Sequence, residues 1–247
     1  MQHPAILRRL EAVRDALRSA RAVLAVAGPT AALAMEAGAV PERLSIVPGV
    51  VDDRTPGRDR AAARRLLGVG ADDPVVGGGG LPGWRKGTGR LPTISRELGR
   101  RRGATRVLWV GGHPTGAQAD RRGVDDGVRW EPERDQPWEL LDGVDVLVVP
   151  SREDPLPLVA LEAGHRRVPV VATATGGLPA LLGGGRGLVV GPYDLAGMVT
   201  ALVGRLADPA AGAEAADALR AHVRAHHAAS VVVPQWWGLL RDAAVGR

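Results

Sequence analysis

Residues 144–164, VDVLVVPSREDPLPLVALEAG, contain the pattern that decides the fold. A short Val-rich run at 144–149 leads through a loop rich in proline and acidic residues into a helical stretch at about 157–166. An apolar run of this length, followed directly by a helix, is typical of a parallel strand that is buried on both faces.

The same alternation repeats on both sides of this segment. Further short strands are expected at 74–77, 106–111, 127–130, 168–172 and 187–190. Helical stretches are expected between them, at about 87–102, 115–122, 137–142, 178–182 and 194–206. With right-handed crossovers, this order predicts an α/β domain with a doubly wound parallel sheet over residues 74–210. Ligands of such sheets bind at the carboxyl ends of the strands, so we expect the function in the loops that follow them.

The two ends of the chain have a different pattern. Residues 1–73 predict a basic helix, a strand at 22–27, a short helix, a strand at 44–48 and a helix near 58–68, which together resemble the last part of a domain. Residues 211–247 predict C-terminal helices with a break at Pro234. Trp236 and Trp237 form a large apolar face there, for which we expect a packing role rather than a sugar platform.

Composition excludes several classes of function. The formal net charge is only +5 over 247 residues, basic and acidic residues alternate, and no aromatic residues are interleaved with basic ones, which argues against nucleic-acid binding. The chain has no cysteine, which removes disulfide scaffolds, thiol nucleophiles and cysteine metal sites, and favours a cytoplasmic protein. His222 and His226 have helical spacing but no third ligand, so no metal site is expected. Neither a secretory signal nor a membrane-spanning helix is expected.

The first candidate motif is GGGGLPGWRKG at residues 77–87. It contains a literal G-x-G-x-x-G dinucleotide fingerprint starting at Gly78, but no carboxylate follows the next strand to bind a nicotinamide ribose. The Gly-Lys-Ser/Thr of a P-loop is absent as well. Lys86 is the single lysine beside 31 arginines, and with Arg85 it ends a loop whose backbone N–H groups suit a diphosphate. The alternative interpretation is a glycine-rich turn with solvated cations.

The second candidate motif follows the Val-rich run at 144–149. Pro157 suits the first turn of a helix, and the free N–H groups near Leu158 and Val159 suit a phosphate. Asp154 lies in the loop and Glu162 lies within the helix, so two carboxylates could hold sugar hydroxyls at both ends of a nucleotide sugar. The alternative is an acidic N-cap with a surface glutamate.

Residues 75–206 resemble the C-terminal, donor-binding domain of glycosyltransferase family 4, whose retaining enzymes have the GT-B fold. The matching segments are the loop at 78–87, SREDP at 151–155, LEA at 161–163, VPVV at 168–171, GGLP at 176–179, and GLVV at 187–190 followed by Asp194. The resemblance implies a Rossmann-like domain beside an incomplete N-terminal α/β portion, with the C-terminal helices at 211–247 returning toward the N-terminal side. It also implies transfer of a sugar from a nucleoside diphosphate sugar to an acceptor hydroxyl, with retention and without a metal or other cofactor.

The resemblance also implies residue roles. Lys86 and Arg85 would bind the donor diphosphate, Asp154 would meet the donor sugar near the reacting carbon, and Glu162 would bind the ribose. The loop after Trp130 would line the base. The expected donor-binding set is Gly78, Gly79, Gly80, Arg85, Lys86, Leu156, Pro157, Leu158, Val159 and Glu162. The acceptor would be a sugar or a lipid-linked sugar, and whether the basic surface contacts a membrane is left open.

The sequence departs from the family pattern at four positions. Asp154 replaces the usual glutamate, Leu156 a common phenylalanine, Ala180 a glutamate and Gly80 an arginine. The acceptor-side domain is incomplete, which leaves three explanations: a truncated gene model, half of a split enzyme, and a standalone nucleotide-sugar-binding module that does not catalyse. Self-association through the exposed apolar face is a further expectation. A nicotinamide-dependent oxidoreductase is the remaining alternative.

Overall fold

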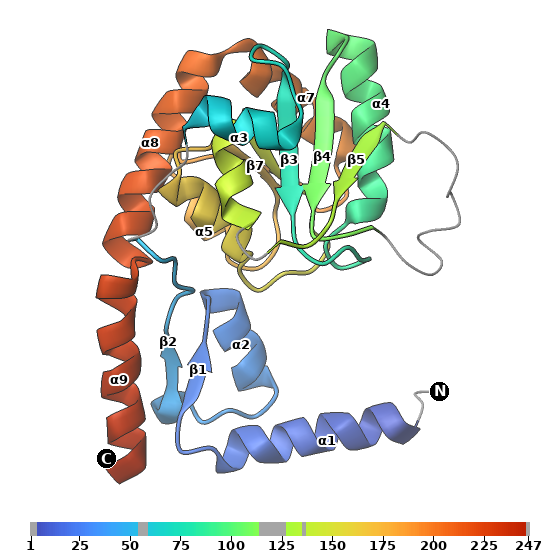
Figure 1. Cartoon of the computed structure of the whole chain (residues 1–247). Coiled ribbons are helices and arrows are strands. Elements are labelled where there is room, and N and C mark those ends of the chain that lie inside the picture. Colours follow the sequence, from blue (N-terminus) through green and yellow to red (C-terminus); the bar gives the residue numbers. More distant parts are fainter. Residues whose placement is uncertain (1–3, 54–58, 114–126, 135–136, 246–247) are drawn as a thin grey trace.

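The computed structural model describes residues 4–53, 59–113, 127–134 and 137–245 (Figure 1). Its main sheet has six parallel strands in the order β5-β4-β3-β6-β7-β8. The strands are β3 (Val75–Gly79), β4 (Arg106–Val110), β5 (Val128–Glu131), β6 (Val146–Val149), β7 (Val170–Thr173) and β8 (Leu188–Val190). The chain builds outward from β3 on one side and from β6 on the other, so the order reverses between these two strands. The doubly wound parallel sheet is thus confirmed, and its switch point lies between β3 and β6.

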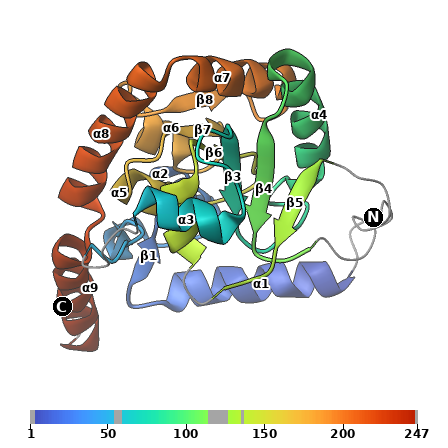
Figure 2. The ribbon, with the colours of Figure 1, turned by 45° about the horizontal axis from the view of Figure 1, so that its top comes forward.

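Helices cover both faces of this sheet, which explains why its strands are apolar throughout. One face packs against α3 (Arg60–Leu67), the 3₁₀ helix η4 (Pro137–Gly143), α5 (Leu158–His165), α6 (Leu178–Leu182) and α8 (Pro209–His226). The other face packs against α4 (Leu91–Arg102), which follows the 3₁₀ helix η2 (Thr88–Arg90), and against α7 (Leu195–Ala207). Figure 2 shows α4 and α7 along one side of the sheet and α3 and α5 along the other. The helix expected at 115–122 lies outside the described residues.

The N-terminal region forms a second, smaller sheet. Its elements are α1 (Pro4–Ser19), β1 (Val23–Ala25), α2 (Gly28–Glu36), the 3₁₀ helix η1 (Pro41–Arg43) and β2 (Leu44–Ile46), with β1 and β2 parallel. In Figure 1 this region lies at the end of the molecule toward which β3 and β4 point. The helix α3 does not join it, although it falls within residues 1–73. Its Leu67 is fully buried in the core of the large sheet, and the Arg64 guanidinium donates to the Gly143 carbonyl at 3.0 Å.

The predicted helix break at Pro234 is wrong. The helices α8 and α9 (Ala229–Val245) separate at His227 and Ala228, whereas Pro234 lies inside α9. The break has a tertiary cause, because the Val51 N–H donates to the His227 carbonyl at 2.9 Å and the Ala229 N–H donates to the Val51 carbonyl at 3.1 Å. These backbone groups are therefore engaged by a distant segment rather than by a continuous helix.

Trp236 and Trp237 do not pack within the described chain, and the exposed apolar face expected for them is present instead. Their exposed fractions are 40% and 63%, while Val232, near the start of α9, is fully buried. The tryptophans lie farther along α9 than this contact, so their rings remain on the surface of the described chain.

We predict that two helical glycines respond to alanine with opposite signs. At Gly164 in α5 an added Cβ would lie 2.8 Å from both the Leu219 and the Val223 side chain, so Gly164→Ala should lower the free energy of unfolding by about 1–3 kcal/mol through overpacking. At Gly99 in α4 no atom lies within 4 Å, so Gly99→Ala should raise it by about 0.5–1 kcal/mol. Urea unfolding followed by circular dichroism measures both; a stabilised Gly164→Ala would contradict the α5–α8 contact.

Candidate functional site

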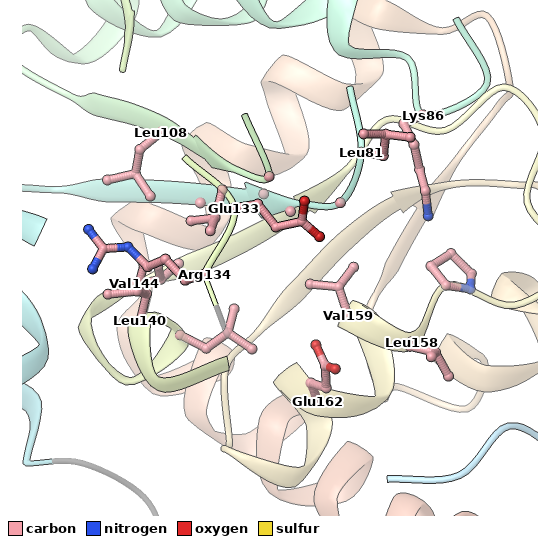
Figure 3. Close-up of a pocket in the computed structure, with 18 of the residues that line it drawn as sticks. Leu81, Lys86, Leu108, Glu133, Arg134, Leu140, Val144, Leu158, Val159 and Glu162 are labelled. Atoms are coloured by element: carbon pink, nitrogen blue, oxygen red, sulfur yellow. The ribbon is translucent and has the colours of Figure 1, made fainter. Parts of the chain in front are cut away.

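A cavity of about 420 Å³ opens at the carboxyl ends of β3 and β6, at the switch point of the sheet (Figure 3). Its walls come from the glycine-rich end of β3 with the loop after it, from the loop that precedes α5, and from the segments around η4. The cavity lies where the topology of the sheet predicts a ligand.

The loop after β3 is fixed to its neighbours through backbone contacts. The Gly80 N–H donates to the Val110 carbonyl at 2.8 Å, and the Trp109 indole donates to the Gly80 carbonyl at 2.7 Å. On the other side, the Arg152 N–H donates to the Arg85 carbonyl at 2.7 Å. These bonds hold the loop over the end of β6.

At two positions of this loop region, neighbouring atoms of the protein itself leave no room for any side chain, so glycine is required there without reference to a ligand. A Cβ at Gly78 would lie 2.5 Å from the Trp109 ring, and a Cβ at Gly87, whose φ is 69°, would lie 1.9 Å from the Pro150 carbonyl oxygen. At Gly79 the nearest atom to an added Cβ is 3.5 Å away, and both Gly79 and Gly80 line the cavity. The glycine run therefore serves close packing at its start and an open wall at its end.

The chain's single lysine meets the first predicted carboxylate. The Lys86 ammonium donates to Asp154 Oδ2 at 2.6 Å, and the two side chains are 26% and 6% exposed. Both residues line the cavity, so the structure brings together two residues that are distant in the sequence. Arg85 is placed differently: its side chain is exposed and does not line the cavity.

The helix α5 supplies the opposite wall. Leu156, Pro157, Leu158, Val159 and Glu162 all line the cavity. Pro157 is the N-cap of α5 rather than part of its first turn, and the first N–H groups of a helix have no acceptor within the helix.

Glu162 points from α5 into the cavity (Figure 3). Burial raises the pKa of its carboxyl group, while the nearby charges of Arg166 and Lys86 act in the opposite direction. The carboxylate therefore lies where a ligand with hydroxyl groups would offset its desolvation.

The loop after β5 closes the far end of the cavity. Glu133 and Arg134 line it there, as expected for the segment after Trp130. Glu131, which was not predicted to contribute here, supports this wall without lining the cavity: its buried carboxylate accepts from Arg134 at 3.0 Å and from Arg129 at 2.6 Å, and so holds the Arg134 side chain in place. Sequence alone offers only a strand-ending glutamate between two arginines as a signal for this role.

The apolar floor of the cavity was also missed. Leu140, Leu141 and Val144 line it, together with Leu108 and Val110 of β4. The short apolar pattern near 137–142 predicted a helix but gave no indication that its side chains border a ligand cavity.

Among the residues that the structure describes, no group of three or more histidine, cysteine, aspartate or glutamate residues is arranged to hold a metal ion. None of the helices in the described part of the chain combines the length and the apolarity that crossing a membrane requires.

Comparison with known sequences decides the family. The profile described as "Glycosyl transferases group 1" matches residues 79–208, which include both loops of the cavity. The chain belongs to the group 1 glycosyltransferases. It is 34% identical over 229 residues to a D-inositol 3-phosphate glycosyltransferase of Acidothermus cellulolyticus, covering 85% of this chain and 50% of the relative. It is also 34% identical over 190 residues to the enzyme of the same name from Mycobacterium avium, covering 71% of this chain and 43% of the relative. The chain thus spans half or less of the length of these relatives.

Solved structures of glycosyltransferases show the same fold as this domain. Sucrose-phosphate synthase from Thermosynechococcus elongatus matches with a TM-score of 0.85 and 25% identity, over 98% of this chain and 63% of that one. The HepE protein of Anabaena, in complex with UDP-glucose, matches with a TM-score of 0.82 and 22% identity, over 96% of this chain and 68% of that one. The fold is thus that of the GT-B glycosyltransferases, and the nicotinamide alternative is excluded by the family.

We predict that Gly176 is indispensable for the position of Asp154. Its φ is 50°, and an added Cβ would lie 1.9 Å from the Asp154 carbonyl oxygen. Gly185 is a matched control, because its φ is 81° but no atom lies within 4 Å of an added Cβ. Gly185→Ala should cost only the left-handed strain, about 1–2 kcal/mol, and Gly176→Ala roughly 1–3 kcal/mol more. Equal losses in thermal unfolding of the two variants would show that the contact with the Asp154 backbone is unimportant.

Proposed function

We propose that this chain is the donor-binding part of a retaining, metal-independent glycosyltransferase that moves a sugar from a nucleoside diphosphate sugar to an acceptor hydroxyl. The observation that carries the proposal is the convergence of Lys86, Asp154 and Glu162 on one cavity at the switch point of the sheet. A cation, a buried carboxylate and a second carboxylate at this position suit the diphosphate, the sugar and the ribose of such a donor, in that order.

In this proposal Lys86 and the N-terminus of α5 hold the diphosphate. The ammonium supplies a charge-assisted hydrogen bond, and the N–H groups at Leu158 and Val159 add the positive end of the helix dipole. As the bond between the sugar and the diphosphate breaks, negative charge grows on the departing oxygen, and these groups stabilise it. Arg85 adds charge from the rim of the site, since its exposed side chain does not line the cavity.

The two carboxylates orient the rest of the donor. Asp154 accepts hydrogen bonds from the sugar near its reacting carbon, and Glu162 accepts from the ribose hydroxyls. The base then extends toward Glu133 and Arg134, which lie at the end of the cavity formed by the loop after β5. Holding sugar and leaving group in this geometry contributes to the rate through orientation.

The positive charge in this scheme comes from side chains and backbone N–H groups, so the transfer does not depend on a divalent cation. The acceptor in this proposal is a sugar or a lipid-linked hydroxyl compound; the D-inositol 3-phosphate in the name of a relative is likewise a hydroxyl compound, although it is neither of these. The cysteine-free sequence favours the cytoplasm as the compartment.

A second candidate is a nucleotide-sugar-binding module without turnover. It is favoured by one observation: among the described residues, those that line the cavity all lie between Gly77 and Glu162, so binding would need only the domain that contains the large sheet. Turnover when an acceptor-binding domain of a relative is supplied as a second chain would exclude this candidate.

Calorimetric titration with UDP, GDP and ADP tests the proposed site. One of the three should bind, and Lys86→Ala should weaken it about tenfold or more, because one charge-assisted phosphate contact is lost. Arg85→Ala, which removes the same charge one residue away, should have a smaller effect. If a folded chain binds none of the three nucleotides, the proposed donor site is contradicted.

The proposed chemistry makes a separate prediction. With an acceptor-binding domain supplied, an α-linked donor sugar should give an α-linked product, and EDTA should leave the rate unchanged. For a donor sugar of gluco or galacto configuration, the coupling constant of the anomeric proton in the ¹H NMR spectrum of the product distinguishes retention from inversion. An inverted product, or activity that EDTA abolishes, would contradict retention or metal independence, respectively.

A further inference from the structure

The ion pair between Lys86 and Asp154 bears on how the site distinguishes its ligands. We propose that this pair competes with diphosphate binding, so that the site favours a nucleoside diphosphate that carries a sugar over the free nucleoside diphosphate. Asp154 would then determine specificity and promote product release, in addition to orienting the sugar. This inference rests on the proposed donor site.

The charged side chains that line the cavity make Lys86 the main cation for a diphosphate. The cations that line the described cavity are Lys86 and Arg134, and Arg134 is already held by Glu131 at 3.0 Å. The carboxylates that line it are Glu133, Asp154 and Glu162, so acidic groups outnumber basic ones. An incoming diphosphate therefore depends on the Lys86 ammonium, which lies 2.6 Å from Asp154 Oδ2.

Transfer of Lys86 to a phosphate has a cost at Asp154. The Asp154 side chain is only 6% exposed, so water can replace the ammonium poorly. A buried carboxylate that loses its cation is strongly destabilising unless other donors reach it. The hydroxyl groups of a bound sugar are such donors, since each can give one hydrogen bond to the carboxylate.

The hydrogen bonds available to Asp154 change once the sugar has been transferred to the acceptor. The nucleoside diphosphate that remains no longer offers the sugar hydroxyls. Asp154 therefore has no hydrogen-bond donor for as long as Lys86 stays on the phosphate. Return of Lys86 to Asp154 restores the buried pair and weakens the hold on the product. The pair thus favours the donor at binding and the departure of the nucleoside diphosphate afterwards.

The test compares UDP with UDP-glucose by calorimetric titration of the full chain, with GDP and GDP-mannose, and ADP and ADP-glucose, in parallel. The wild type should bind the sugar nucleotide more tightly than the free one. The Asp154→Asn variant should bind the free nucleotide at least about tenfold more tightly than the wild type does, because Lys86 is released from its ion pair. Its preference for the sugar nucleotide over the free nucleotide should be smaller. Glu153→Gln is the matched control: Glu153 is exposed and does not line the cavity, so its removal should leave both affinities unchanged.

A double-mutant cycle shows whether the effect passes through the ion pair. In the Lys86→Ala background, Asp154→Asn should change the affinity for the free nucleotide much less than it does in the wild type. Unchanged or weaker binding of the free nucleotide by a folded Asp154→Asn would overturn the inference. So would equal or tighter binding of the free nucleotide by the wild type, a comparison that needs no variant.

These outcomes distinguish failure of the ion-pair competition from failure of the proposed donor site. If the wild type binds a nucleotide, Lys86→Ala loses it and Asp154→Asn does not tighten it, the donor site stands and the competition is refuted. If the folded wild type binds no nucleotide in either form, both are refuted. Melting temperatures of all variants, read by circular dichroism, establish that the compared chains are folded.

Discussion

The close approach of two backbone segments at the switch point is the constraint on which the rest of the site depends. Gly87 lies against the Pro150 carbonyl so closely that any side chain would occupy the same space, and the Arg152 N–H donates to the Arg85 carbonyl. This contact joins the loop after β3 to the loop after β6. It places a lysine at the end of one loop against an aspartate in the other, and the cavity forms between them.

The net charge of the chain differs in sign from the charge of the residues around the cavity. The chain carries a net positive charge through its many arginines, yet the residues around the cavity are acid-rich. A single ammonium therefore has two competing partners, a buried carboxylate and, in the proposed function, a diphosphate. Burial strengthens this competition, because a carboxylate that water cannot reach must find its donors among the side chains or in the ligand.

The two sheets of the molecule differ in size and in how far their apolar surfaces are covered. The large sheet has helices on both faces, and its strands, loops and helices contribute the described residues that line the cavity. The small sheet has two strands, and large apolar side chains remain exposed on β2 and α9, among them Ile46 and Trp237. The proposed donor site is thus assembled within the domain that contains the large sheet.

The sequence by itself determined the strand–helix alternation, the parallel sheet and the two motifs of the site. Each of these depends on neighbouring residues, because burial on both faces makes a strand apolar and a close backbone contact requires glycine. Only the tertiary structure decided that α8 ends at His226, well before Pro234, since the break after it arises from hydrogen bonds with Val51. Likewise, the pairing of Lys86 with Asp154 joins residues that are 68 positions apart, and the burial that gives the pair its strength exists only once β3 and β6 lie side by side.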